Sequence, residues 1–508
     1  MSFLHDAPST SLPLLPPLLR QMLRPLPLLP LQIALGAFLR GILHRHPHLL
    51  DRLGSHRGKR FGIKPTDLPF AFVIQAGPQR PQLAAVRELP TDLDASISAS
   101  IVSLLALVEG RLDGDALMFS RQLVVEGDIE AVLALRNAID DAGLDLVGEI
   151  AALSGPLSVP AQRLLAAARG HTEIDGERKR DATMELICPA GTPAALKSAV
   201  EAGADAVYCG FADETNARNF PGLNFSREQL RDGIALAHRR GAKVLVAINT
   251  FPRAGAVELW HRAVDDAVAA GADALILADV GLMDYAARRH PEQRLHVSVQ
   301  AAAANVDAIA FYVENFGARR VVLPRVLSVP EIAEITRETA CETEVFVFGG
   351  LCVMAEGRCS LSSYATGKSP NMQGVCSPPS HVAYQETPQG TTSRLGGFTI
   401  NRFGRDEPAG YPTLCKGRFS TTQGAGYLFE DPVSLDATIL LAGLREAGVT
   451  ALKIEGRQRG RAYVDGVVRH FRSVLSALDA GRSADASGLT AFTEGQATTQ
   501  GAYRKTWR

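Results

Sequence analysis

The chain has 508 residues, 46% of them hydrophobic and 21% charged, which predicts two or three globular domains with sizeable cores. Its 53 basic and 54 acidic residues leave a net charge of −1, so no overall field attracts nucleic acid, and we expect no nucleic-acid partner. Seven cysteines in so long a chain exclude a disulfide framework and indicate a reducing compartment, the cytoplasm.

The first 30 residues form a segment rich in leucine and proline. Six prolines between Pro13 and Pro30 would break a membrane-spanning helix, and no small-residue cleavage site indicates a signal peptide. A helix is predicted from about Leu31 to His46, with one apolar side and a second side that carries Arg40. Its pattern slightly favours a packed core helix over one that lies on the membrane surface, so peripheral contact with the inner face of the membrane stays open.

Residues 31–170 alternate short strands with helices, which is typical of an α+β domain. We expect strands at 69–75 and 81–87, a helix at 94–109, one or two strands at 116–126, and a helix at 129–140 followed by others to about 168. Such a layer can enclose an apolar tunnel for a lipid, although the same side chains would also fill an ordinary core, which the residues alone favour. The tunnel candidates are Phe70, Phe72, Ile74, Ile101, Leu105, Leu117 and Phe119.

A polar stretch without periodicity, residues 171–183, is predicted to be a linker to a second domain at 184–480, which precedes a tail at 481–508. In the second domain eight short apolar strands alternate with amphipathic helices. This pattern predicts an α/β fold, a (β/α)8 TIM-type barrel, with an open doubly wound sheet as the alternative. The strands are expected at 185–188, 205–209, 243–248, 273–278, 295–299, 320–323, 344–348 and 451–455, and the helices near 193, 226, 255, 281, 305, 328, 434 and 461.

In such a barrel the chemistry lies at the carboxyl ends of the strands. Lys453 and Glu455 alternate with Ile454, so both can point into one polar mouth, or they can form a buried ion pair that closes the barrel. Guanidinium groups at these ends would hold a carboxylate. The catalytic candidates are Lys453, Glu455, Arg457, Arg218, Gln300 and Asn249, with Arg325 as a further carboxylate-binding candidate.

Four cysteines follow the seventh strand in a long loop rich in glycine, serine and proline. Their separations of 7, 17 and 39 residues lack the close pairs typical of structural zinc, whereas a cubane cluster accepts thiolates from scattered loops. Spacing alone leaves an iron–sulfur cluster, zinc and unligated core cysteines as alternatives. The four are Cys352, Cys359, Cys376 and Cys415, while Cys188, Cys209 and Cys341 are predicted to be packed thiols.

Residues 344–362, Glu-Val-Phe-Val-Phe-Gly-Gly-Leu-Cys-Val-Met-Ala-Glu-Gly-Arg-Cys-Ser-Leu-Ser, resemble the signature of the collagenase-like peptidase family, type U32. With the cysteine spacing and Lys-Ile-Glu-Gly-Arg at 453–457, the sequence is most similar to the UbiU-like branch, and the resemblance covers about residues 184–480. Phe348 stands where peptidases and tRNA-modifying members have a histidine, which argues against a peptidase. The resemblance implies a 4Fe-4S cluster on Cys352, Cys359, Cys376 and Cys415.

In the first domain, residues 114–128 and the Leu-Ala-Leu-Arg-Asn segment at 133–137 resemble the sterol-carrier-protein-type lipid-binding domain in its UbiT-like form. This resemblance covers roughly residues 20–170. It implies a lipid-binding accessory module with no chemistry of its own.

Together the two resemblances imply oxygen-independent hydroxylation of a polyprenylated ubiquinone precursor, which the first domain presents to the barrel. They also imply prephenate as hydroxyl donor and a heterodimer with a UbiV-like second cluster protein. The alternatives within the family are a peptidase and an RNA-hydroxylating protein. No Ser/His/Asp order or His-Glu-x-x-His motif supports the first, and a lipid-binding domain has no use in the second.

Overall fold

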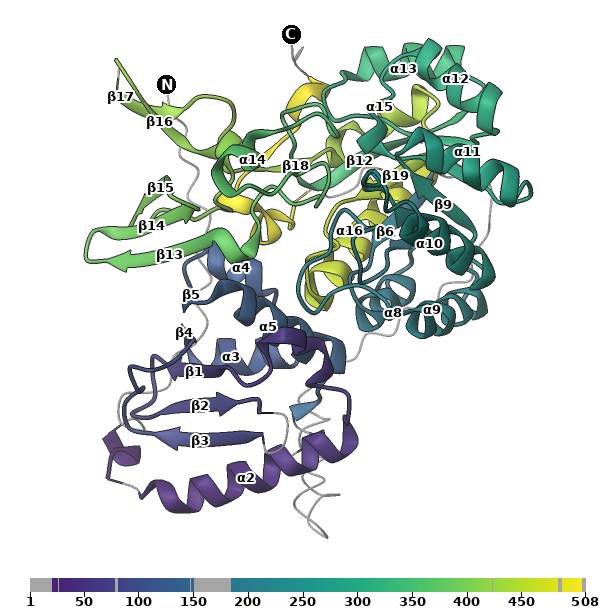
Figure 1. Ribbon diagram of the computed structural model, residues 1–508. Helices are drawn as coiled ribbons and strands as arrows, with labels where there is room; N and C mark the ends of the chain where they lie inside the picture. The colour runs from purple at the N-terminus through teal and green to yellow at the C-terminus, as the bar shows by residue number, and fades with distance from the viewer. Residues whose placement is uncertain are drawn as a thin grey trace.

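The N-terminal module is a five-stranded sheet with helices packed against it (Figure 1). In this computed structural model the described residues are 21–25, 27–77, 81–146, 148, 149, 184–422, 424–482 and 487–504. The strand order is β3-β2-β1-β4-β5, and every neighbouring pair is antiparallel except β1 and β4. The elements are α2 (Leu28–Arg45), η1 (Asp51–His56), β1 (Arg60–Pro65), β2 (Ala71–Gln75), β3 (Gln82–Val86), β4 (Ala95–Ala99), α3 (Ile101–Val108), α4 (Gly114–Phe119), β5 (Leu123–Gly127) and α5 (Ile129–Ala142).

Two predicted elements of the module differ in the structure, and β1 has no predicted counterpart. The helix expected at 94–109 begins only at Ile101, because residues 95–99 form β4 between β1 and β5, and Ser100 caps the helix by accepting a bond from the Ser103 amide. The strand expected at 116–126 is α4 followed by β5. Asp113 accepts a hydrogen bond from the Ala116 amide at 2.8 Å, so this residue, expected in a turn, is the N-cap of α4.

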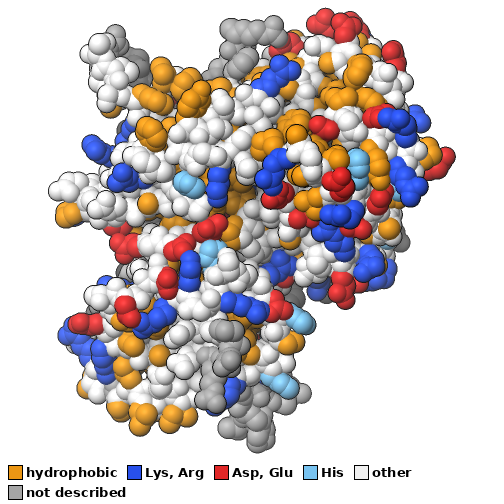
Figure 2. All heavy atoms as spheres, viewed as in Figure 1, with side chains coloured by type: hydrophobic (Ala, Val, Ile, Leu, Met, Phe, Trp, Pro, Cys, Tyr) orange, Lys and Arg blue, Asp and Glu red, His pale blue; other side chains and the backbone are white. Residues whose placement is uncertain are grey.

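The helix predicted near the N-terminus is confirmed as α2; it packs along β3, with Ile42 buried and most other side chains half-buried or exposed. Figure 2 shows hydrophobic side chains along the lower edge of the molecule, where Figure 1 places α2, and Leu29 and Ile33 are 69% and 66% exposed. In the described part of the chain no helix has the length and apolar character needed to cross a membrane. The helices expected up to 168 and the linker at 171–183 lie outside the described residues, apart from 144–146, 148 and 149.

The second domain is a closed eight-stranded parallel barrel, so the barrel prediction is confirmed and the open sheet is wrong. The ring runs β11-β10-β9-β8-β7-β6-β19-β12 and closes through β11 and β12. All eight strands lie where the alternating pattern predicts them. Their bounds are β6 (Glu185–Pro189), β7 (Ala206–Cys209), β8 (Lys243–Ile248), β9 (Ala274–Leu277), β10 (Leu295–Val297), β11 (Arg320–Val322), β12 (Glu342–Gly350) and β19 (Ala451–Ile454).

Helices around the barrel begin at polar caps that are visible in the sequence. Ser226 and Ser328 open α9 and α13 in capping boxes, and Asn305 caps α12. The helix expected near 434 is wrong at its start, because residues 434–436 form β18, which pairs antiparallel with β12. The helices are α8 (Pro193–Glu201), α9 (Arg227–Arg239), α10 (Glu258–Ala269), α11 (Val280–Arg289), η3 (Val299–Ala301), α12 (Val306–Phe316), α13 (Val329–Glu338), η6 (Thr438–Leu440), α15 (Leu441–Glu446) and α16 (Arg461–Asp479).

Alternation along the strands separates two cores. One set of side chains, including Ile187, Tyr208 and Ile276, forms a small cluster inside the barrel, and the other set packs against the surrounding helices. Phe348 belongs to the second set: it is buried, with its ring centroid 6.1 Å from Tyr463 and 6.0 Å from Phe471. The position where a histidine is expected in peptidases therefore lies in the helical layer.

The long loop after β12 is an insertion with its own secondary structure. It carries a three-stranded antiparallel sheet and a two-stranded hairpin, which project to the left of the barrel in Figure 1. The segment expected as a tail packs on this region, since β20 pairs with β18 and the Tyr503 hydroxyl donates to the Phe346 carbonyl at 2.5 Å. The bounds are α14 (Leu361–Thr366), η4 (Pro379–His381), β13 (Val382–Thr387), β14 (Gly390–Leu395), β15 (Phe398–Gly404), η5 (Leu414–Lys416), β16 (Arg418–Thr421), β17 (Gly424–Tyr427), β18 (Ser434–Asp436), η7 (Thr490–Phe492), η8 (Glu494–Gln496), β20 (Thr498–Thr499) and η9 (Gly501–Tyr503).

Candidate functional site

A cavity of about 280 Å³ lies over the carboxyl ends of the barrel strands. Its floor is formed by side chains from these strand ends, and one wall by the insertion after β12. A second wall is formed by α4 and α5 of the N-terminal module. All six sequence-predicted catalytic candidates line it: Arg218, Asn249, Gln300, Lys453, Glu455 and Arg457.

The four cysteines of the insertion also line this cavity. Each carries a free thiol. A negative charge on Cys359 would raise the pKa of Cys376, and a negative charge on Cys376 would raise that of Cys415. Burial raises the pKa of Cys352 well above its usual value and that of Cys415 to about 12, so ionisation of these thiols needs a compensating positive charge. Within the described residues no group of three or more His, Cys, Asp or Glu side chains has the arrangement of a metal-ion site.

Two glycines let the cysteine loop lie against the barrel. Gly357 has φ +75°, and a Cβ there would lie 1.9 Å from the Gln300 carbonyl oxygen. Gly374 has φ +69°, and its Cβ would lie 2.2 Å from the Cα of Ala217. Backbone therefore meets backbone at both points, which holds the loop close to the strand ends.

Cys188, Cys209 and Cys341 are buried away from this cavity, which confirms them as packed thiols.

Besides Arg136 of the module, three arginines of the second domain face the cavity, and they differ in their partners. Arg325 donates from Nε to Glu356 at 2.7 Å, and Arg218 Nε lies 3.6 Å from Glu455. Among the described residues Arg457 has no carboxylate at ion-pair distance, and its Nη1 donates to the Asn216 side chain at 2.6 Å. Burial lowers the pKa of Arg457 to about 10, so the guanidinium is still charged at neutral pH and is the one available to a ligand anion.

Lys453 both faces the cavity and forms a buried ion pair, as predicted, but its partner in that pair is Glu344 and not Glu455. Lys453 Nζ lies 2.5 Å from Glu344 and 4.0 Å from the centre of the Tyr208 ring, and it also faces the cavity. Burial lowers the pKa of Lys453 more than Glu344 raises it. Glu455 instead accepts from the Gly350 amide at 3.1 Å; burial opposes its ionisation, but Arg218 and Arg325 bring its pKa below the usual value.

The Glu344 carboxylate is fully buried and pairs with two cations, because besides Lys453 it also accepts from Arg320 at 3.4 Å. We expect Glu344→Gln to lower stability by about 3–5 kcal/mol, since it leaves Lys453 buried without a counter-charge. Chemical denaturation followed by circular dichroism measures this. The matched control is Glu338→Gln, a half-exposed carboxylate paired with Arg337, for which we expect about 0.5 kcal/mol or less. Equal stability of both variants would contradict a role of the Glu344 pair in closing the barrel.

Polar groups that follow β8 and β10 complete the floor. Asn249 accepts from the Ala217 amide at 3.1 Å and donates to the Ser298 hydroxyl at 3.4 Å. The Gln300 side-chain oxygen is buried, and within the described residues it has no hydrogen-bond partner. Because an orphaned buried acceptor is costly, Gln300 is available to a donor on a bound ligand.

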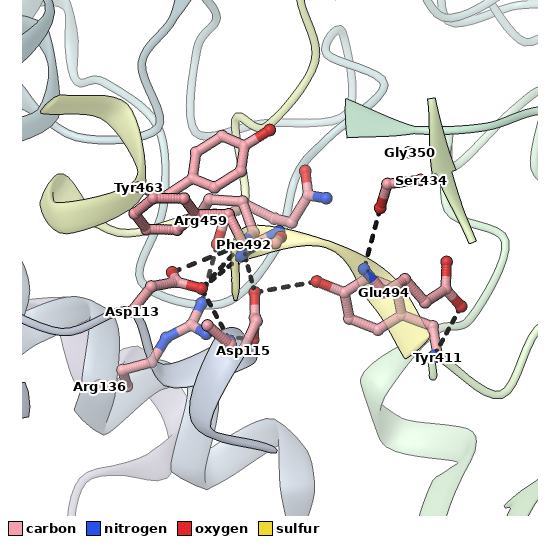
Figure 3. A network of polar contacts seen from close by, with 12 residues as sticks. Asp113, Asp115, Arg136, Gly350, Tyr411, Ser434, Arg459, Tyr463, Phe492 and Glu494 are labelled. Atoms are coloured by element: carbon pink, nitrogen blue, oxygen red, sulfur yellow. Dashed lines mark hydrogen bonds and ion pairs between the residues drawn. The ribbon is translucent and has the colours of Figure 1, made fainter. Parts of the chain in front are cut away.

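The N-terminal module is fixed to the barrel by a buried polar network, drawn in Figure 3. Arg459 forms an ion pair with Asp113 and lies 3.3 Å from Asp115, and all three side chains are buried. Arg136 donates to Asp115 at 2.7 Å and to the Gln458 carbonyl at 2.8 Å. The bonds of Arg459, and that of Arg136 to Gln458, cross between α4 and α5 on one side and the loop after β19 on the other.

The same network reaches the cysteine loop. The Tyr411 hydroxyl donates to Asp115 at 2.9 Å, and the Tyr411 amide donates to Glu494 at 2.9 Å. Glu494 in turn pairs with Lys416 at 2.5 Å, next to Cys415 in the chain. The position of the module and that of one cysteine are thus connected through buried contacts. Neither Tyr411 nor Glu494 has a local sequence signal that would have marked it.

None of the seven predicted tunnel residues lines the cavity. Leu117 and Ile74 belong to the core of the module, and Phe119 packs edge-on against Tyr411 at 4.9 Å. Leu105 is 44% exposed on α3, so the expectation that it faces a tunnel or the core is wrong. Phe70 and Phe72 form an edge-to-face pair at 5.6 Å, and Ile101 is half-buried. The module residues that do line the cavity are Asp115, Met118, Ile129, Leu133, Arg136 and Asn137.

Comparison with known proteins separates the same two parts. The sequence model of peptidase family U32 matches residues 191–505, and that of the SCP-2 sterol transfer family matches residues 39–140. The tRNA hydroxylation protein P of Escherichia coli K12 is 33% identical over 326 residues, which are 60% of this chain and 70% of that protein. The 23S rRNA 5-hydroxycytidine C2501 synthase of the same organism is 31% identical, over 58% of this chain and 40% of that protein. A solved structure described as UbiJ-SCP2 ubiquinone synthesis protein matches 24% of this chain and 98% of its own, with 24% identity and a TM-score of 0.21.

Proposed function

We propose that this chain, which belongs to peptidase family U32 and carries an N-terminal SCP2 domain, hydroxylates a polyprenylated ubiquinone precursor without molecular oxygen. The observation that carries the proposal is the shared cavity, in which four thiols, a set of buried cations and apolar side chains of the SCP2 domain face one another. A redox group, an anionic co-substrate and a lipid can meet at such a site.

The donor set suits an iron–sulfur cluster better than a single ion. Four thiols from one insertion surround a common cavity, and a cubane cluster is larger than an ion and takes its ligands from scattered loop positions. Cys352, Cys359, Cys376 and Cys415 would hold it. A bound cluster supplies one-electron redox chemistry and the positive charge that buried thiolates require.

The cationic floor would hold the hydroxyl donor. Because Arg325 and Arg218 already lie next to Glu356 and Glu455, Arg457 is the side chain we assign to a carboxylate of the donor, and prephenate is a dicarboxylate of suitable chemistry. Gln300 can accept a hydrogen bond from a hydroxyl of the same molecule or of the aromatic ring. These residues bind and orient, and no group in the floor needs to act as a nucleophile.

Two further expectations belong to this proposal. A second cluster-bearing protein, UbiV-like, would complete the active assembly as a heterodimer. The exposed leucine and isoleucine side chains of α2 would allow peripheral contact with a membrane, from which an insoluble precursor is collected.

RNA hydroxylation is the second candidate, and it is favoured by the activities named for the E. coli relatives. Figure 2 shows basic and acidic side chains intermixed over the face drawn, and they form no continuous basic surface there. Peptide hydrolysis has less support, because the cavity lining, as far as the structure describes it, contains no histidine that could activate a nucleophile.

The test is a reconstituted reaction under anoxia. We expect the anaerobically purified chain, with its UbiV-like partner and prephenate, to add one oxygen atom to a prenylated phenol, as detected by mass spectrometry. Arg457→Lys should raise the KM for prephenate more than it lowers kcat, because the ammonium cannot form the two parallel bonds of a guanidinium. Total tRNA and rRNA are the competing substrates in parallel reactions. Hydroxylated cytidine or uridine in the RNA, with an unchanged phenol, would replace the proposal by the second candidate.

A further inference from the structure

We infer that one face of α4 and α5, formed by Met118, Ile129 and Leu133, is the subsite that holds the first part of the apolar tail of the substrate. This inference rests on the proposed function and adds a location to it. It places the tail at the interface between the SCP2 domain and the barrel, and it makes the domain a fixed wall of the active site.

The first support is that α5 has two apolar faces. Val132 and Leu135, with their alanine neighbours, are buried in the core of the module. Leu133 lies on a second stripe of the helix and lines the cavity, and Ile129, four residues before it, lines the cavity while also packing against the edge of the core. A helix that only covered its own sheet would need the first face alone. Both side chains of the second face are half-buried, so they keep apolar surface that a ligand can cover.

The second support is the distribution of chemistry along the cavity. The cysteines come from the insertion and Lys453 and Arg457 from the barrel floor, whereas the module wall adds the apolar side chains of Met118, Ile129 and Leu133 beside Asp115, Arg136 and Asn137. An amphipathic molecule with an aromatic head at the barrel and its tail along the module matches this polarity. A volume of about 280 Å³ is at the lower end for ligand sites. It accommodates a head group and the beginning of a tail, so a long polyprenyl chain must continue beyond it.

The third support is that the wall is held in place. Besides the Arg459 network, Arg461 lies 3.3 Å from Asp140 at the C-terminal half of α5, and Arg52 pairs with Asp141 at 2.5 Å while donating to the Gly222 carbonyl at 3.0 Å. Contacts at the start of α4 and along the C-terminal half of α5 therefore fix these two helices relative to the strand ends. A carrier that released its cargo by moving away would not need buried ion pairs at this interface.

The test measures binding by the full chain and does not depend on turnover. The probes are phenol, 2-geranylphenol, 2-farnesylphenol and the fluorescent fatty acid cis-parinaric acid, titrated under anoxia. We expect Leu133→Glu to weaken binding of farnesylphenol roughly tenfold or more, because it places a carboxylate against the tail, and to leave phenol unchanged. Leu133→Ala, which keeps the wall apolar but shortens it, should give a smaller loss that grows from geranylphenol to farnesylphenol. The control is Leu105→Glu, an exposed leucine of the same module outside the cavity.

Each outcome decides a different statement. Farnesylphenol binding that is equal in Leu133→Glu and wild type, with both proteins melting alike, overturns the subsite and leaves the proposed function standing. Equal weakening by Leu105→Glu also overturns it, because the tail then lies on the α3 side of the module. If wild type binds cis-parinaric acid in a Leu133-dependent way but none of the phenols, the apolar subsite stands and the proposed substrate class is wrong.

Discussion

Serine at Cys352, Cys359, Cys376 or Cys415 should remove most of the iron from the protein and abolish hydroxylation. An anaerobic preparation of the wild type should be brown and contain about four irons per chain, as a cubane on four thiolates requires. Serine is a weaker ligand of nearly the same size, so each variant should fold and yet lose the colour. Iron and zinc are counted by plasma mass spectrometry, and absorption is recorded before any exposure to air.

The matched control for this series is Cys341→Ser. Its thiol is buried at the edge of the barrel, outside the cavity lining, and makes a weak bond to the Ala318 carbonyl at 3.9 Å. It should keep its iron. Stoichiometric zinc in a colourless wild-type protein would contradict the cluster. A series in which the variants lose iron and melting temperature but keep activity would make the cluster structural.

The barrel could be predicted because its signals are local and repeated. Most βα units show a short apolar strand, a polar cap such as Ser226 or Asn305, and a glycine before the next strand, so the pattern needs no knowledge of distant contacts. The carboxyl-end rule then placed Lys453 and Glu455 at the mouth. It could not assign the partner of Lys453, because Glu344 lies on another strand and becomes a neighbour only through the barrel register.

The errors in the N-terminal module have the opposite origin. Residues 95–99 are short, rich in alanine and serine, and compatible with a helix, and they become β4 only because strands lie on both sides of them. The segment after Asp113 has apolar and β-branched residues typical of a strand, yet its first half is a helix that begins at the Asp113 cap. Short apolar runs of this kind are ambiguous until the tertiary neighbours are known.

The part of the site that could not be predicted from the sequence is formed where the N-terminal module packs against the barrel. Met118 and Leu133 belong to the N-terminal module and Glu494 to the segment after the predicted barrel, and no motif marks them. Their roles depend on how one folded unit packs on another. The predicted linker at 171–183 indicates a tethered lipid-binding domain, whereas the buried ion pairs of Arg459 with Asp113 and Asp115 fix the described part of the module against the barrel.

Arg459→Ala should therefore detach the SCP2 domain from the barrel. The substitution leaves Asp113 and Asp115 buried without their shared cation, which costs about 3–5 kcal/mol and weakens docking roughly a hundredfold or more. To measure this, a protease site is placed within residues 171–183 and cut after folding. The two halves of the wild type should co-elute in gel filtration at micromolar concentration, and those of the variant should separate.

The control is Arg469→Ala on α16, which removes an exposed pair with Asp465 and should leave the halves together. If the wild-type halves separate after cleavage, the module is not a fixed wall of the site and acts instead as a tethered carrier. Because Asp115 also reaches Tyr411 and, through Glu494, the lysine beside Cys415, Arg459→Ala should in addition change the electron paramagnetic resonance spectrum of the reduced cluster. A spectrum that stays identical while the halves separate would show that docking shapes the tail-binding wall alone, and that the cysteine loop is held by the barrel without help from the module.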